Sequence, residues 1–156
     1  MIQFRCAVLA VKDVEVSKRF YGELFDRKVI LDLGKNATLD GGFALQEDFP
    51  WLLDLPEDSV VWKPHNMELY FEADDFDAFL EKLKRFDVRL VHPPKKHEWQ
   101  QRVVRIYDPD GHIVEIGESM AVIARRYLAE GYSVHETAQI IQHPAEFVEL
   151  CRTGKL

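Results

Sequence analysis

Two stretches of the chain share one pattern of apolar and polar positions, a short strand followed by an amphipathic helix. In the first stretch, residues 7–11 form an apolar run that is typical of a β-strand. Asp13 follows and predicts a helix N-cap, because its carboxylate can accept a hydrogen bond from a backbone N–H. Val16, Phe20 and Leu24 then recur every four residues, which places them on one face of a helix.

The second stretch repeats this order further along the chain. Residues 69–73 are strand-like, and Asp75 is a second candidate N-cap. Four apolar side chains follow at positions i, i+3, i+4 and i+7, namely Phe76, Phe79, Leu80 and Leu83. This spacing predicts an amphipathic helix.

Each stretch is followed by further short apolar runs. They are Val29–Leu33 and Phe43–Gln46 in the first half, and Val88–Val91, Arg102–Tyr107 and Ile113–Ile116 in the second half. Residues 47–63 contain Pro50 and Pro56 and are typical of a connector. An internal duplication of this kind predicts an α+β fold. We expect two βαβββ modules, about residues 1–50 and 66–118, that form a cup-shaped curved sheet within a domain of residues 1–118.

Residues 119–156 depart from this pattern and predict a C-terminal extension of three short helices. The first begins at Ser119, the second follows a capping box of Ser133 and Glu136, and the third spans residues 145–152. The order has some likeness to the helix-turn-helix of DNA-binding proteins. Its cations and anions balance, however, whereas a DNA reader presents a basic face. We therefore expect a packing or dimer-supporting extension.

Composition narrows the class of protein. A net charge of −7 argues against non-specific binding to nucleic acid or to an anionic membrane. No apolar run approaches the ~20 residues that span a bilayer. The two cysteines, Cys6 and Cys151, do not resemble a disulfide framework, and the first residues lack the features of a secretion signal. We therefore expect a cytoplasmic protein.

The segment from Tyr107 to Ile116 carries the clearest chemical signal. An Asp-Pro-Asp-Gly turn leads into the strand Ile-Val-Glu-Ile, so that Glu115 stands at the centre of an apolar strand. A buried charge is costly unless it is paired. Alternation places Glu115 on the face opposite Val114 and Ile116, the face that we expect to line the cup.

The same alternation brings further polar residues to that inner face. Glu68 and Tyr70 come from one strand and Arg105 and Tyr107 from another, while Trp99 precedes the second strand as a rim residue or a packing anchor. Facing carboxylates of Glu68 and Glu115 repel each other, which raises the pKa of one and provides an acid–base pair. We expect Arg105, Tyr107, Tyr70 and Trp99 to contact the substrate.

The histidines carry less information. His92 and His97 flank a Pro-Pro-Lys-Lys segment that is typical of a mobile connection or lid. His112 lies in the turn, where we expect it to be solvated. His65 is near Glu68 in sequence and is the one histidine with a possible role at the site.

Three segments together resemble the vicinal oxygen chelate superfamily, which includes glyoxalase I, bleomycin-resistance proteins and extradiol dioxygenases. They are residues 9–21, residues 71–75 and residues 108–115, in the right order within residues 1–118. The resemblance implies paired βαβββ modules that form a cup, usually completed in a homodimer. The superfamily hosts enzymes and metal-free binding proteins, so fold alone does not give the activity.

The resemblance also implies a set of metal positions. Its metal-dependent members place His or Gln on the first strand of module one, His on the first strand of module two and Glu on the last strands. Those positions hold Cys6, Glu68 and Glu115 here, with Leu45 or Gln46 at the fourth. Thiolate and carboxylate ligands suit Zn, and two carboxylates with other oxygen donors suit Mn or Mg. Ni, which usually binds imidazole, is a further candidate. A divalent metal on Glu115, Glu68 and Cys6 is therefore one hypothesis.

Three functions follow as hypotheses. The first is a glyoxalase-like lyase or isomerase that acts on an unidentified small molecule through Glu115 and Glu68, with or without a divalent metal. The second is a metal-free small-molecule binding or resistance protein. The third is a ligand-sensing regulator that uses the helical tail. A small-molecule ligand and a homodimer are expected in each case.

Overall fold

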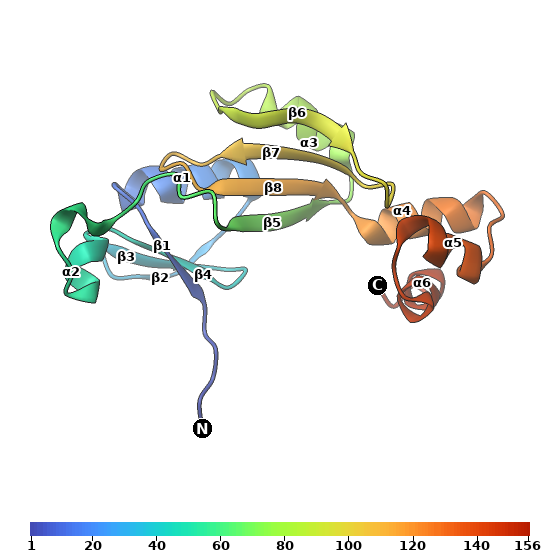
Figure 1. Cartoon of the computed structure of the whole chain (residues 1–156), viewed down its shortest axis with the longest axis horizontal. Helices are drawn as coiled ribbons and strands as arrows, with labels where there is room; N and C mark the ends of the chain where they lie inside the picture. The colour runs from blue at the N-terminus through green and yellow to red at the C-terminus, as the bar shows by residue number, and fades with distance from the viewer. The chain divides into compact units, whose positions relative to one another are not determined.

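The computed structural model describes all residues from 1 to 156 and divides into two compact units (Figure 1). The first unit comprises Met1–Met67 together with Tyr107–Ile113, and the second comprises Glu68–Ile106 together with Val114–Leu156. The turn between the last two strands of the second sheet therefore belongs to the first unit. Each unit contains its own sheet and is described by itself below.

The first unit contains one four-stranded sheet and a long helix. Its elements are β1 (Ala7–Ala10), α1 (Val14–Phe25), β2 (Val29–Asp32), β3 (Asn36–Leu39), β4 (Phe43–Gln46), α2 (Phe49–Leu53) and the 3₁₀ turn η1 (Glu57–Ser59). The strand order is β1-β4-β3-β2, with β1 parallel to β4 and the other pairs antiparallel. The predicted connector of residues 47–63 thus contains a short helix and a 3₁₀ turn.

The helix α1 begins where the sequence predicts. The Asp13 carboxylate accepts a hydrogen bond from the Val16 backbone N–H at 3.0 Å, and Asp26 ends the helix in the left-handed region. Tyr21 and Leu24 are fully buried as α1 packs on β3 and β4. The Tyr21 ring meets the Phe43 ring edge-on, with 5.0 Å between centroids. These contacts form the core of the first unit.

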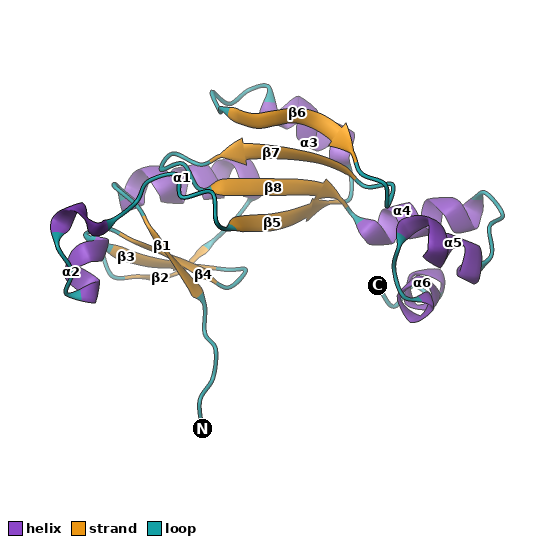
Figure 2. Ribbon diagram, in the orientation of Figure 1, coloured by secondary structure: helices purple, strands orange, loops and turns teal.

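The second unit repeats the order of elements and adds three helices. Its elements are β5 (Glu68–Ala73), α3 (Phe76–Leu83), β6 (Leu90–Lys96), β7 (Arg102–Tyr107), β8 (Ile113–Glu118), α4 (Met120–Ala129), α5 (Val134–Ile141) and α6 (Ala145–Arg152), as Figure 2 shows by secondary structure. The strand order is β5-β8-β7-β6. Two consecutive βαβββ modules are therefore present, and the predicted α+β class is confirmed.

The strand β6 corrects one prediction. Pro93, Pro94, Lys95 and Lys96 belong to β6 and are not a mobile connection or lid. The strand lies at the end of the sheet order and pairs with β7 only, and its register shifts between His92 and Lys95. The two adjacent prolines are tolerated here because the strand lies at the sheet edge and its ladder is already interrupted between His92 and Lys95.

The three C-terminal helices pack on one another around an apolar cluster. Ile123 of α4, Ile141 of α5, and Val148 and Cys151 of α6 are buried in it. The predicted capping box is present, because the Ser133 hydroxyl accepts from the Glu136 N–H at 3.2 Å and the Glu136 carboxylate accepts from the Ser133 N–H at 2.8 Å. The division of the chain at residue 118 stays a prediction, but the helices themselves form as expected.

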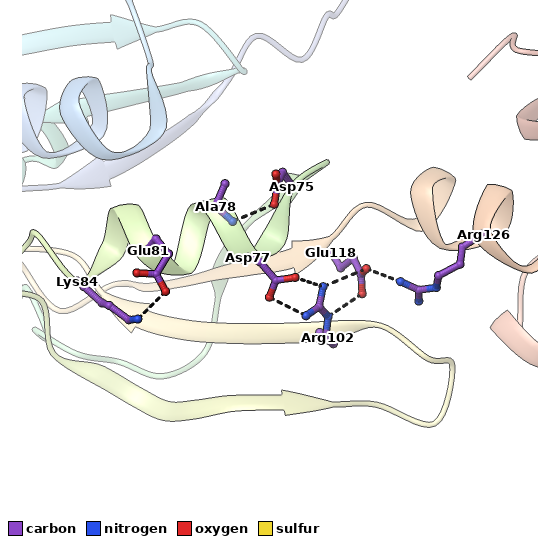
Figure 3. A network of polar contacts seen from close by, with 8 residues as sticks. All are labelled: Asp75, Asp77, Ala78, Glu81, Lys84, Arg102, Glu118 and Arg126. Carbon is purple, nitrogen blue, oxygen red and sulfur yellow. Dashed lines mark hydrogen bonds and ion pairs between the residues drawn. The ribbon is translucent and has the colours of Figure 1, made fainter.

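An ion-pair network ties α4 to the second sheet (Figure 3). Arg102 of β7 contacts Asp77 of α3 at 2.9 Å and Glu118 at the end of β8 at 3.1 Å, and Arg126 of α4 reaches the same Glu118 at 2.8 Å. Burial raises the pKa of Glu118, but hydrogen bonds from the two arginines outweigh it, and the net pKa is lowered. Glu118 is therefore held as a carboxylate between the sheet and the helices.

None of the helices combines the length and the apolar composition that crossing a membrane would require.

Candidate functional site

Arg105 lies at the centre of the polar face of the second sheet. Its Nε donates to Glu68 Oε2 on β5 at 2.8 Å, and its Nη2 pairs with Glu115 Oε2 on β8. Its Nη1 lies 3.3 Å from His92 Nε2 on β6. Four strands thus contribute one side chain each to a single cluster. We call these four residues, together with Tyr70 on the same face of β5 as Glu68, the Arg105 face.

The strand pattern explains why these side chains share a face. Val104 and Ile106 flank Arg105 in sequence and are fully buried, as are Val114 and Ile116 on either side of Glu115. Alternation therefore sends the charged residues to the opposite face, as predicted. The side chain of Glu115 is only 7% exposed, whereas that of Glu68 is 38% exposed.

Arg105 stands between the two carboxylates of the expected acid–base pair, which stays a prediction. Glu68 and Glu115 share one guanidinium, so their mutual repulsion is compensated. This bridge could not be predicted from strand alternation, because it depends on how far the arginine side chain reaches to each neighbouring strand. The two carboxylates stay candidates for function, but as partners of a cation.

The same geometry does not fit a bound divalent metal. The carboxylates of Glu68 and Glu115 both pair with Arg105, so its positive charge already engages the two groups that a cation would need. No group of three or more His, Cys, Asp or Glu side chains is arranged to hold a metal ion. Cys6 is half-buried just before β1 in the first unit, and its role as a ligand stays a prediction.

His92 is held in one tautomer by its two neighbours. Its Nδ1 lies 2.8 Å from the Pro93 carbonyl oxygen, which can only accept a hydrogen bond. Nδ1 therefore carries the proton, and Nε2 offers a lone pair to Arg105 Nη1. The sequence indicated no role for His92, which was expected only to flank a loop.

A second polar chain runs beside this cluster. Gln101 Nε2 donates to the Tyr70 hydroxyl at 2.6 Å, and the Trp99 indole N–H donates to Gln101 Oε1 at 3.0 Å. Burial raises the pKa of Tyr70 to about 12. Gly117 permits this approach, since a Cβ there would lie 2.4 Å from Gln101 Nε2. Gln101, which the sequence reading missed, thus connects Tyr70 to Trp99.

Trp99 is a packing anchor. Its ring stacks on His97 with 4.1 Å between centroids and packs against the apolar cluster of the C-terminal helices. Burial, together with nearby positive charges, lowers the pKa of His97. Trp99 therefore connects the polar chain to the helices, and its expected contact with substrate stays a prediction.

Tyr107 belongs to the first unit and has different neighbours. Its hydroxyl lies 2.9 Å from His65 Nε2, and the ammonium of Lys63 stands 4.7 Å from the centre of its ring. His65 therefore has a polar partner, although not Glu68. The substrate contact expected of Tyr107 stays a prediction.

The turn before β8 contains a buried polar cluster that sequence reading missed. Asp108 Oδ2 accepts from the Tyr21 hydroxyl at 2.8 Å and lies 2.8 Å from His112 Nδ1. Asp110 accepts from the Lys12 N–H at 3.1 Å and from the Ser17 hydroxyl at 3.4 Å. The prediction that His112 is solvated is wrong, because its side chain is 10% exposed and paired with Asp108. The sequence signal that could have revealed this cluster is Tyr21, whose hydroxyl needs a polar partner on the buried face of α1.

The chain is similar to known proteins over most of its length. The family model described as "Glyoxalase-like domain" matches residues 4–121. The metallothiol transferase FosB of Lysinibacillus sphaericus is 25% identical over 109 residues, which cover 69% of this chain and 76% of that protein.

Solved structures give the same fold. A protein of unknown function from Agrobacterium tumefaciens is 36% identical, with a TM-score of 0.66 over 76% of this chain and 95% of the other. The fosfomycin resistance protein FosX from Listeria monocytogenes is 19% identical, with a TM-score of 0.58 over 76% of this chain and 94% of the other. At that identity, the second likeness concerns the fold alone.

Proposed function

Because the chain belongs to the glyoxalase-like domain family of the vicinal oxygen chelate superfamily, we propose that it binds a small polar molecule on the Arg105 face without a resident metal. The observation that carries this proposal is the fixed guanidinium of Arg105, held by Glu68, Glu115 and His92. A side chain held from three strands loses little freedom when a ligand binds, which favours affinity.

The hydrogen-bonding capacity of the face indicates the ligand chemistry. A guanidinium has five N–H donors, and the three contacts leave two of them for a ligand oxygen. Glu68 is partly exposed and can accept a hydrogen bond from a ligand hydroxyl. In a molecule with a hydroxyl on the carbon next to a carbonyl group, the carbonyl oxygen can accept from Arg105 and the hydroxyl can donate to Glu68. We therefore expect an α-hydroxy carbonyl compound.

NMR titration of the intact protein tests this proposal. Hydroxyacetone should shift the Arg105 Nε–H signal and the amide signals of β5, β7 and β8, while acetone, which lacks the hydroxyl, should not. Glu68→Gln should weaken binding about tenfold, the typical effect of losing a charge-assisted hydrogen bond.

Glu81→Gln is the matched control, because Glu81 is an exposed carboxylate on α3 that pairs with Lys84. It should bind hydroxyacetone as the unchanged protein does. Equal binding of acetone and hydroxyacetone, or equal weakening by both variants, contradicts the proposal.

A catalytic role is a second candidate, favoured by the different exposure of the two carboxylates. Arg105 orients Glu68 while leaving it 38% exposed, so Glu68 can take a proton from the hydroxyl-bearing carbon next to the carbonyl, and the electron pair of that C–H bond passes to the carbonyl oxygen as an enediolate forms. This is the proton transfer of an isomerase. Exchange of that hydrogen for deuterium in heavy water, lost in Glu68→Gln, would support catalysis over binding alone.

A third candidate comes from the relatives. FosB proteins are named metallothiol transferases, and FosX is named a fosfomycin resistance protein. Consumption of fosfomycin in the presence of a thiol and a divalent metal would favour this activity. The ion pairs of Arg105 argue against it, since they occupy both carboxylates that the metal would need.

We also propose that two copies of the chain associate through β2. This strand ends the sheet order of the first unit and exposes three apolar side chains, Val29, Ile30 and Leu31, at 39%, 65% and 51%. An exposed apolar strand edge favours pairing with another chain. Light scattering should show a dimer that Ile30→Lys converts to a monomer. Val61→Lys, at an apolar position that is 71% exposed outside β2, should remain dimeric. If the unchanged protein is a monomer, the proposed association through β2 is wrong.

A further inference from the structure

The first unit contains a cleft that neither the Arg105 face nor the family assignment accounts for. It measures about 570 Å³ and opens where β1 and β4 end, at Val11 and Glu47. The rest of its lining comes from residue 12 and from residues 48–62, which carry α2 and η1. A volume of this size is typical of sites for small molecules.

Two tryptophans give the cleft its aromatic surface. Trp51 of α2 is 78% exposed and Trp62 is 38% exposed, although indole rings usually lie largely buried. The Lys12 ammonium stands 4.7 Å from the centre of the Trp62 ring, so one aromatic wall already holds a cation. The geometry of the cleft is therefore compatible with positive charge against its aromatic walls.

The backbone holds Trp51 in this position. Asp48 and Asp54, which flank α2, both adopt left-handed backbone conformations, with φ values of 52° and 55°. Pro50 stands in the first turn of α2, where its fixed φ suits a helix. Non-glycine residues adopt this region at some cost in energy. The chain thus maintains a constrained segment that presents an indole to solvent.

The charges of the lining favour a cation. Three carboxylates, on Glu47, Asp48 and Glu57, stand against the single ammonium of Lys12. Two of them are engaged, because Glu47 accepts from the Val14 N–H at 3.3 Å and Asp48 pairs with Lys35. Glu57 is exposed on η1 and can face a bound molecule.

We propose that this cleft is a second ligand site, which takes an organic cation with a flat aromatic body. The aromatic body stacks on Trp51, the positive charge lies near Glu57, and Lys12 limits the affinity by competing for the Trp62 ring. All of the lining belongs to the first unit, so the site is independent of the Arg105 face and its ligand.

Titration of the full chain with N-methylquinolinium chloride tests the proposal, with quinoline at pH 8 as the uncharged analogue of the same shape. The chain has three tryptophans, which give three indole N–H signals by NMR. The signals of Trp51 and Trp62 should shift with the cation, and that of Trp99 in the second unit should not. Quinoline should bind at least about threefold more weakly, as expected for an exposed cation–π contact.

Two variants should act in opposite directions. Glu57→Gln should weaken binding of the cation about two- to fourfold, and Lys12→Met should strengthen it by a similar factor, because single exposed charges have effects of this size. Trp51→Ala should weaken it about fivefold or more, since stacking on an aromatic wall is lost. Glu23→Gln, an exposed carboxylate on α1 outside the lining, is the control and should leave binding unchanged.

Equal affinity for quinoline and N-methylquinolinium overturns the charge argument. Shifts at Trp99 as large as those at Trp51, or weaker binding by Lys12→Met, overturn the assigned position. Because the Arg105 face is tested with hydroxyacetone, failure of one proposal leaves the other standing.

Discussion

Replacement of Asp108 with alanine is expected to lower the free energy of unfolding by about 3–5 kcal/mol, the range found when one partner of a buried charged network is removed. Asp108 is 5% exposed and accepts from the Tyr21 hydroxyl and from the backbone N–H groups of Asp110 and His112, besides pairing with the His112 ring. Without the carboxylate, these donors lose their partner inside the first unit. Denaturant unfolding measures the loss.

Asp87→Ala is a matched control, because Asp87 is an exposed aspartate between α3 and β6. It should change the free energy of unfolding by less than about 0.5 kcal/mol, as surface substitutions usually do. A loss below about 1 kcal/mol for Asp108→Ala would show that the cluster contributes no more than an ordinary hydrogen bond.

The same cluster gives stability a dependence on pH. Burial lowers the pKa of His112, but the hydrogen bond and the negative charge of Asp108 outweigh it, and the net pKa is raised above 6.5. The folded state therefore binds the proton more tightly than the unfolded state. The contribution of His112 is complete below pH 6.5 and is lost as the pH rises through the raised pKa. The dependence of the unfolding free energy on pH that comes from His112 should be absent in His112→Gln.

Replacement of Arg105 with methionine is expected to abolish ligand binding on the Arg105 face and to destabilise the protein by about 2–4 kcal/mol. This loss of stability lies below the usual cost of breaking a buried ion pair, because Glu68 is partly exposed and screened by solvent. Glu115 is 7% exposed and would be left as a buried carboxylate without its cation. Unfolding curves and the hydroxyacetone titration measure the two effects separately.

A double variant separates stability from binding. Arg105→Met with Glu115→Gln removes the unpaired charge, so it should recover most of the lost free energy of unfolding while ligand binding stays absent. Recovery of binding in the double variant would show that Arg105 acts only by neutralising Glu115, and that the ligand does not contact the guanidinium.

Much of the fold was predictable because it depends on local chemistry. Asp13 and Asp75 cap the helices that the apolar spacing predicts, and Ser133 with Glu136 forms the expected capping box. The strand β3 was not placed, since Asn36–Leu39 is short and has no apolar run. The family resemblance was also confirmed, because the matched model covers residues 4–121.

The site was less predictable, because its contacts depend on side chains that meet across strands. Alternation brought Glu68, Arg105 and Glu115 to one face, but it gave no means of seeing that the arginine bridges the two carboxylates. His92 was expected to flank a loop, because two prolines follow it. His112 was expected in solvent because turns usually lie at the surface. Each error arose where tertiary contacts outweigh local sequence preference.

The adjacent prolines of β6 have a consequence for solubility. The outer edge of the second sheet would otherwise offer a row of free N–H and C=O groups to any extended peptide. Pro93 and Pro94 supply no N–H donors, and Lys95 and Lys96 place two like charges beside them. An incoming strand would have to desolvate lysines and forgo ladder bonds at the same place. The segment therefore discourages edge-to-edge stacking of sheets, and aggregation that begins at this edge is suppressed.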